Sequence, residues 1–171
     1  MFSDPIKNLK TLALRESDVV ADLGAGTGYY AIAAAKIVPS GKVYAVELQK
    51  DFLATIKHKA KEAHLSNVEC FWGNVEKIGG TKIKEGVVDV VLASNIFFQV
   101  EDQNIFIEEI KRILKKGGRL LLIDWSDSIA FPLLEPVPAP QARNMFETKG
   151  FVYERQIDAG EHHYGMILVK K

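Results

Sequence analysis

Two acidic residues and a glycine-rich loop follow apolar segments of the chain, and their spacing suggests a ligand site. Asp22 lies two residues before the first glycine of the loop Gly24-Ala25-Gly26-Thr27-Gly28, and Glu47 lies 25 residues beyond Asp22. Glycines let the backbone turn tightly and let a ligand approach the main chain. A helical pattern begins at Tyr29, so free N–H groups and a positive dipole end face the loop. Glu47, at the end of a predicted strand, can accept hydrogen bonds from ribose hydroxyls.

The spacing of this loop argues against a nicotinamide dinucleotide and hence against an oxidoreductase, the first alternative enzyme class. A dinucleotide fingerprint is Gly-x-Gly-x-x-Gly, whereas Tyr29 stands where its third glycine belongs. The carboxylate of Asp22 would also repel a pyrophosphate, but it suits a ligand that carries an ammonium and a sulfonium, as S-adenosylmethionine does. No Lys-Ser or Lys-Thr follows the loop, which excludes a Walker-type phosphate site.

Hydrophobic periodicity predicts seven strands and several helices around the loop. Asp4 and Pro5 are typical of an N-cap and a first helical residue, so a short helix opens the chain. The expected strands are Val19–Leu23, Lys42–Leu48, Asn67–Trp72, Val87–Ala93, Arg119–Asp124, Phe151–Gln156 and Tyr164–Lys170. The expected later helices are Tyr29–Ile37, Asp51–His64, Asp102–Leu114 (ended by Gly117-Gly118) and Gln141–Lys149. The prolines Pro132, Pro136, Pro138 and Pro140 indicate a loop.

Alternating strands and helices predict an α/β fold, a three-layer α-β-α sandwich with a mostly parallel sheet. The last two strands lack a helix between them, and a short connection permits only antiparallel pairing, so one strand is reversed. Ligands of such sheets bind beyond the carboxyl ends of the strands. We expect one domain over residues 1–171, with an N-terminal helical segment 1–17 and a core 18–171.

The segment from Val19 to Tyr30 resembles motif I of class I (Rossmann-like) S-adenosylmethionine-dependent methyltransferases, especially small ubiquinone-biosynthesis-like proteins with the generic methyltransferase domain. The other matching segments are Lys42–Glu47, Gly73-Asn74, Asp89–Asn95 and Leu114–Trp125. The resemblance covers almost the whole chain and implies the strand order 3-2-1-4-5-7-6. It also implies S-adenosylmethionine as cofactor, with S-adenosylhomocysteine as product.

The resemblance implies a role for each matching residue. Asp22, Gly24, Gly26 and Gly28 would hold the methionine end, Glu47 both ribose hydroxyls and Leu48 the adenine; Asn74 and Val75 would read the adenine edge, and Ser94 would face the sulfonium. Most relatives carry Asp where this chain has Asn74, whose amide can still accept a bond from the exocyclic amine. A plain loop cap is the alternative interpretation of Asn74.

The sequence specifies the catalytic residues less clearly than the cofactor-binding residues. Close relatives often carry a histidine two or three residues after Asn95, where this chain has Ile96-Phe97-Phe98-Gln99. Either phenylalanine could wall an apolar acceptor or contact a sulfonium, but packing in the core is the simpler interpretation. The candidate catalytic residues are Asn95 and Asp124, and the weaker candidates for a base are Asp127, His162 and His163. A pair of adjacent histidines alone does not predict a metal site.

The amino-acid composition limits the classes of acceptor and partner that the chain is expected to have. Lys+Arg and Asp+Glu both number 22, and nucleic-acid binders usually carry a basic excess, so a nucleic-acid partner is disfavoured. One cysteine, Cys70, fits a reducing cytoplasm and excludes an internal disulfide. We expect Cys70 to pack as a small apolar strand residue. No apolar run is long enough for a membrane span.

A small-molecule or lipid-like acceptor therefore remains, methylated by in-line displacement. An RNA or protein methyltransferase and a non-catalytic cofactor-binding or scaffold protein are the alternatives. The segments able to cover the site are short, so a second copy or a partner subunit can also close it.

Overall fold

The computed structural model describes residues 4–126 and 135–171. Its elements are α1 (Pro5–Lys10), β1 (Val19–Leu23), α2 (Tyr29–Ile37), β2 (Lys42–Glu47), α3 (Lys50–Glu62), β3 (Val68–Trp72), β4 (Val88–Ser94), η1 (Phe97–Gln99), α4 (Gln103–Ile113), β5 (Leu114–Trp125), α5 (Ala139–Thr148), β6 (Phe151–Ile157) and β7 (His163–Lys170). Among these residues, no helix is long and apolar enough to cross a membrane.

The sheet confirms the predicted topology. Its seven strands are ordered β3-β2-β1-β4-β5-β7-β6. The first five strands pair in parallel with one another, and β7 lies antiparallel to both β5 and β6. The order reverses between β1 and β4, so the carboxyl ends of these strands form the switch point at which ligands of open α/β sheets bind.

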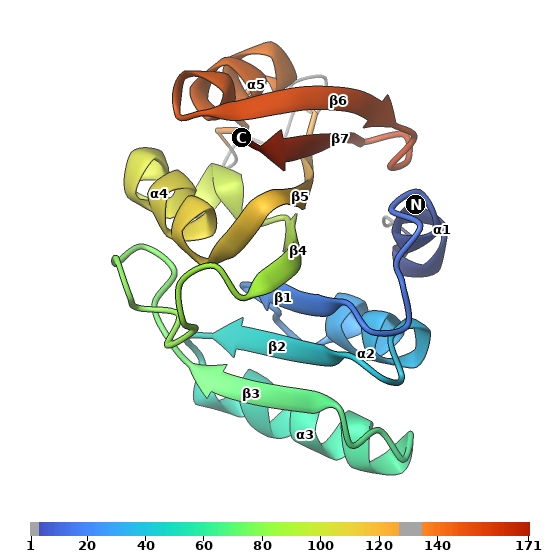
Figure 1. Ribbon diagram of the computed structural model, residues 1–171. Helices are drawn as coiled ribbons and strands as arrows, with labels where there is room; N and C mark the ends of the chain where they lie inside the picture. Colours follow the sequence, from blue (N-terminus) through green and yellow to red (C-terminus); the bar gives the residue numbers. More distant parts are fainter. Residues whose placement is uncertain (1–3, 127–134) are drawn as a thin grey trace.

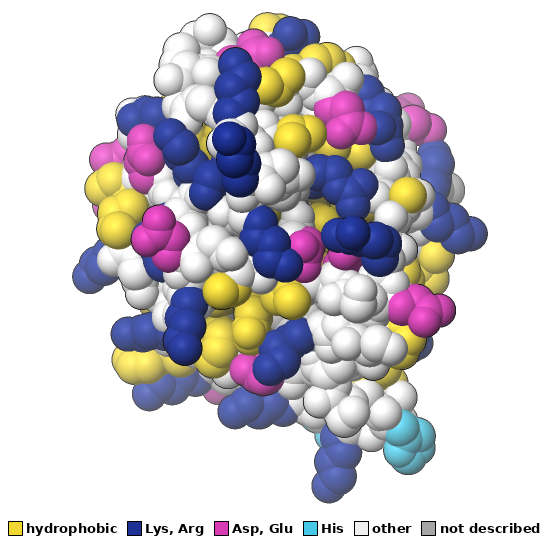
Figure 2. Space-filling view, viewed as in Figure 1, with side chains coloured by type: hydrophobic (Ala, Val, Ile, Leu, Met, Phe, Trp, Pro, Cys, Tyr) yellow, Lys and Arg dark blue, Asp and Glu magenta, His cyan; other side chains and the backbone are white. Residues whose placement is uncertain are grey.

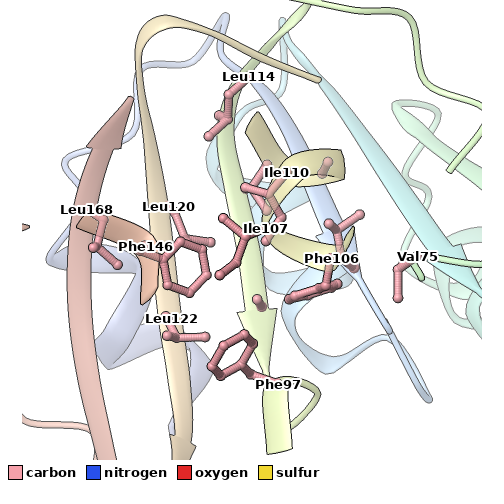
Figure 3. Close-up of a cluster of buried hydrophobic side chains, with 14 of the residues drawn as sticks. Val75, Phe97, Phe106, Ile107, Ile110, Leu114, Leu120, Leu122, Phe146 and Leu168 are labelled. Atoms are coloured by element: carbon pink, nitrogen blue, oxygen red, sulfur yellow. The ribbon is translucent and has the colours of Figure 1, made fainter. Parts of the chain in front are cut away.

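Helices cover both faces of the sheet and bury a separate core on each. Figure 1 shows α2 and α3 beside the β1–β3 half and α4 and α5 beside the β4–β7 half. One core joins α1, α2 and α3 to the sheet through residues such as Leu9, Ala34 and Ile56. The other joins η1, α4 and α5, where Phe97, Phe106 and other side chains converge (Figure 3). The near-continuous apolar strands of the sequence follow from burial on both faces.

The fourth helix ends earlier than we predicted. α4 ends at Ile113, before the Gly117-Gly118 pair that was expected to terminate it, and β5 begins at once with Leu114. Leu114 is extended and pairs with Val88, after which the register shifts before Val90. The glycine pair therefore lies in an irregular part of a strand, and the prediction that it caps a helix was wrong.

The prediction that the prolines lie in a loop was wrong for Pro140. α5 begins at Ala139, and Pro140 lies in its first turn, where no backbone donor is needed. Pro136 and Pro138 are in a loop, as predicted, and Pro132 lies outside the described residues. Cys70 is in β3 as expected, but it is only half-buried because β3 is an edge strand.

Candidate cofactor and acceptor site

A cavity of about 850 Å³ opens at the switch point, beyond the carboxyl ends of β1, β2 and β4. Eight of the nine residues expected to bind the cofactor line it: Asp22, Gly24, Gly26, Glu47, Leu48, Asn74, Val75 and Ser94. They come from four separate segments of the chain, so the fold brings the predicted set together. A cavity of this size is typical of small-molecule sites.

Glu47 joins the glycine loop to the end of β2. Its Oε2 accepts a hydrogen bond from the Gly26 N–H at 2.9 Å, and its Oε1 accepts from the Leu48 and Gln49 N–H groups at 2.8 and 2.9 Å. A carboxylate has about four acceptor positions. Three are occupied, so about one is left for a ribose hydroxyl; binding both hydroxyls, as expected, requires sharing or a small rearrangement.

Asp22 is a buried carboxylate with unused hydrogen-bonding capacity. It is 2% exposed, and its Oδ2 has no hydrogen-bond partner among the described residues. Burial raises the pKa of Asp22 from 3.8 to about 7, the Ala31 N–H opposes the rise, and the charge of Glu47 adds to it. Buried polar atoms are almost always paired. The orphan oxygen therefore fits a cationic or donor group of a ligand in the cavity.

Two of the loop glycines, Gly26 and Gly28, serve different purposes. A Cβ on Gly26 would meet no atom within 4 Å, so the space over this residue is open to a ligand. Gly28 does not line the cavity; a Cβ there would lie 2.8 Å from the Ile56 side chain of α3. Gly28 therefore permits α2 and α3 to pack closely, and its expected direct contact with a ligand has no geometric support.

Asn74 acts as a loop cap and still lines the cavity. Its Oδ1 accepts a hydrogen bond from the Glu76 N–H at 2.8 Å, which keeps the segment after β3 turned toward the cavity. The carbonyl oxygen keeps one acceptor position. Recognition of an adenine amine by this amide stays a prediction.

The two candidate catalytic residues lie in different environments. Asn95 lines the cavity, and its backbone φ is +55°. Its buried Oδ1 has no hydrogen-bond partner in the described part of the chain. Asp124 is 1% exposed and does not line the cavity. Its Oδ2 accepts from the Phe98 N–H at 3.0 Å and its Oδ1 from the Trp125 N–H at 2.8 Å. Burial raises the pKa of Asp124 to about 6, and these amides oppose the rise.

The two histidine candidates lie at and just before the start of β7. His163, the first residue of β7, is buried and stacks on Trp125 with ring centroids 4.2 Å apart. Burial, followed by the charge of neighbouring His162, lowers the pKa of His163. His162 is exposed, and Asp127 lies outside the described residues. Within 4–126 and 135–171, no three His, Cys, Asp or Glu side chains gather as a possible metal site.

The segment after Asn95 places one phenylalanine in the core, as the simpler interpretation predicted. Phe97 is fully buried between Phe106 and Phe146, at centroid distances of 6.0 and 5.4 Å. Ile96 and Gln99 are the members of this segment that line the cavity. Phe97 is therefore a packing residue and not a wall of the site.

Several wall residues were missed by sequence reasoning. They are Pro5, Tyr29, Tyr30, Phe52, Ile96 and Gln99. Pro5 reaches the cavity because Asn8 of α1 donates a 2.8 Å hydrogen bond to the Tyr30 hydroxyl and fixes α1 against α2. Asn8 is 1% exposed, and an isolated asparagine in a short helix gives no indication of this contact from sequence.

The comparisons with known proteins agree with this geometry. A family model described as "Methyltransferase domain" matches residues 14–168. The chain is 29% identical over 119 residues to a demethylmenaquinone methyltransferase of Geobacillus sp. (strain WCH70), covering 69% of this chain and 50% of that protein. It is 32% identical over 108 residues to the protein of that name from Lactococcus lactis subsp. lactis (strain IL1403), covering 63% and 42%.

A solved structure extends the likeness to nearly the whole chain. A SAM-dependent methyltransferase from Aquifex aeolicus superposes with a TM-score of 0.84 at 26% identity, covering 99% of this chain and 91% of that one. The chain spans about half the length of the curated relatives it matches. The family model, by contrast, covers nearly all of it, and the chain therefore belongs to the methyltransferase-domain family.

Proposed function

We propose that this chain is an S-adenosylmethionine-dependent methyltransferase that acts on a small, lipid-like acceptor of the quinone type. The observation that carries the proposal is the pairing of two carboxylates in one cavity at the switch point. Asp22 has a buried oxygen without a hydrogen-bond partner among the described residues, and Glu47 holds the glycine loop with about one acceptor position left. This arrangement suits a ligand with a cationic end and a ribose.

In this proposal each group of cavity residues binds a different part of the cofactor. Asp22, Gly24 and Gly26 take the methionine end, Glu47 takes the ribose, and a third group takes the adenine and sulfonium: Leu48, Asn74, Val75 and Ser94. Gly28 contributes only by letting α2 approach α3. The cofactor supplies an electrophilic methyl group on a good leaving group when bound.

The protein then has to orient the acceptor and keep water out, because displacement from a sulfonium needs little further help. The acceptor would gain the methyl group and release one proton to solvent, with S-adenosylhomocysteine as the second product. Asn95 is the proposed polar contact for the acceptor, since it lines the cavity and its buried Oδ1 has no hydrogen-bond partner among the described residues. Asp124 is proposed to act through the η1 turn: it binds the Phe98 N–H and so fixes the segment that carries Ile96 and Gln99. Asp124 is thus a positioning residue in this account.

The acceptor class is supported by the two curated relatives, both named demethylmenaquinone methyltransferase. A large nucleic acid is a weaker candidate, because basic, acidic and hydrophobic side chains are interspersed on the face in Figure 2 and total charges balance at 22 and 22. We also propose a cytoplasmic location, given the single cysteine, and a homodimer or partner subunit that covers the site.

Transfer of a labelled methyl group tests the proposal. Purified protein is incubated with methyl-labelled S-adenosylmethionine and a cell extract, which is then separated into lipid, RNA and protein fractions. We expect label in the lipid fraction, and in 1,4-naphthoquinols added in reduced form. Label confined to RNA or protein would contradict the acceptor class. Tight cofactor binding with no labelled fraction would instead favour a non-catalytic binding protein.

A further inference from the structure

A second cavity, of about 730 Å³, runs along the outer face of α2. Its walls come from α1, α2 and α3, and we call it the α2 groove: Asp4, Pro5, Ile6, Gly28, Tyr29, Ile32, Ala33, Lys36, Ile37, Lys59, Glu62 and Ala63. The charged members lie among apolar ones. Pro5 and Tyr29 line both the cofactor cavity and this groove, so the two spaces adjoin at these residues.

The sequence of α2 is unusual for a surface helix. Its inner stripe packs in the core through residues such as Tyr30, Ala31 and Ala34. The outer stripe repeats at helical spacing and is also largely apolar: Tyr29, Ile32, Ala33 and Ile37, with Lys36 beside them. Helices that are hydrophobic all round are normally covered on every side. The outer stripe of α2 instead forms the floor of an open groove.

Contacts with Lys59 hold Tyr29, which lines both cavities, next to the glycine loop. Tyr29 is 71% exposed, and the Lys59 ammonium lies 4.3 Å from its ring centroid. The same ammonium donates a 2.8 Å hydrogen bond to the Thr27 carbonyl in the glycine loop. Pro5 is fixed on the other side through α1. The residues shared by the two cavities are therefore held by the same segments that shape the cofactor site.

We propose that the α2 groove binds an apolar chain of the methyl acceptor, which leaves the cofactor cavity between Pro5 and Tyr29 and lies along Ile32, Ala33 and Ile37. The inference rests on the proposed function, since only a lipid-like acceptor has such a chain. The size of the groove favours a small molecule over a protein partner, because small-molecule sites span about 300–1,000 Å³ and protein interfaces are much wider. The span from Tyr29 to Ile37 is about 12 Å at 1.5 Å per helical residue.

A series of acceptors with growing chains tests this inference. We would use 2-alkyl-1,4-naphthoquinols, kept reduced, with alkyl groups from none to longer than the groove. The expected KM falls by up to about fourfold per buried methylene and levels off once the chain exceeds about 12 Å. Calorimetric binding of the same series to the cofactor-loaded protein gives a readout independent of turnover.

Two matched substitutions separate the groove from the rest of the surface. Ala33→Trp fills the groove floor, whereas Ala54→Trp places the same side chain on an exposed position of α3 outside both cavities. We expect Ala33→Trp to abolish the chain-length dependence of KM and binding while leaving kcat/KM for the chainless naphthoquinol unchanged. Ala54→Trp should behave as the wild type.

Each other outcome has a defined meaning. Chain-length dependence that survives in Ala33→Trp, or that is absent from the wild type, overturns the groove assignment. Failure of every alkyl compound to bind also overturns it. Chain-dependent binding without methyl transfer leaves the groove assignment standing and contradicts the proposed reaction alone. A change of oligomeric state in Ala33→Trp, measured by analytical ultracentrifugation, would identify the groove as an interface between copies and overturn the inference.

Discussion

Replacing Asp22 with asparagine should make the protein more stable and less able to bind its cofactor. Asp22 is 2% exposed and its pKa is raised to about 7 from 3.8, first by burial. Between these two pH values the folded chain holds a proton that the unfolded chain has released. The free energy of unfolding therefore falls as pH rises through this window, and the loss is complete above about pH 7.

The magnitude follows from the difference between the two pKa values. A pKa higher by about three corresponds to about 4 kcal/mol at 1.36 kcal/mol per pKa unit. Asp22→Asn removes this penalty, so we expect a gain of up to about 4 kcal/mol at pH 8 and almost none at pH 4. At about 2–4 °C per kcal/mol for a chain of this size, Tm at pH 8 should rise by up to about 8–16 °C.

The same substitution should weaken binding of S-adenosylmethionine about 10- to 150-fold, the usual range for one charge-assisted hydrogen bond. Thermal unfolding from pH 4 to pH 8 and calorimetric titration measure the two effects together. Glu16→Gln, at an exposed acid, serves as the control and should change neither. The reasoning is refuted if Asp22→Asn gains no stability at pH 8 relative to pH 4, or if cofactor affinity stays the same.

Further predictions concern pH, the loop glycines and the buried carboxylate of Glu109 in α4. Wild-type affinity for S-adenosylmethionine should fall by up to tenfold per pH unit below about pH 7 as Asp22 protonates, and a flat profile in calorimetry would contradict this. Gly28→Ala should cost about 1–3 kcal/mol in denaturant unfolding, because its φ is +84° and its Cβ would also meet Ile56. Gly26→Ala meets no neighbouring atom, so beyond the backbone strain of its φ of +52° it should reduce cofactor affinity. Glu109→Gln should lower the free energy of unfolding by about 2–3 kcal/mol, as measured by urea titration. The buried Glu109 carboxylate accepts hydrogen bonds from the Gly79 and Thr81 N–H groups, from the Thr81 hydroxyl and from the Arg112 guanidinium.

The inner strands were predictable because they are buried on both faces and form short apolar segments in the sequence, whereas the edge strands β3 and β6 are only partly buried. The reversed last strand was predictable for a topological reason, since a short connection after β6 (Phe151–Ile157) cannot cross to a parallel neighbour. The end of α4 was not predictable from the sequence. The apolar spacing of Ile110, Ile113 and Leu114 fits a helix up to the glycine pair, and only the pairing of Leu114 with Val88 makes it the start of a strand.

The site shows the same division between local and long-range information. Asp22, Glu47 and the glycine loop were found from sequence because they end adjacent parallel strands, and such ends meet in space. The separate purpose of Gly28 was not visible, because it depends on Ile56 in the next helix. The burial of Asp124 was not visible either, because the η1 turn folds back and donates the Phe98 N–H to it.

The most direct test of the account is calorimetric titration of the wild type and of Glu47→Ala with S-adenosylmethionine, S-adenosylhomocysteine and NAD. We predict that the wild type binds both adenosyl ligands at a single site and does not bind NAD. Glu47→Ala should lose most of this affinity, because the carboxylate holds the Gly26 amide and is proposed to bind the ribose. No binding of either adenosyl ligand by the wild type at millimolar concentration, or equal binding by Glu47→Ala, would contradict the assignment of this cavity.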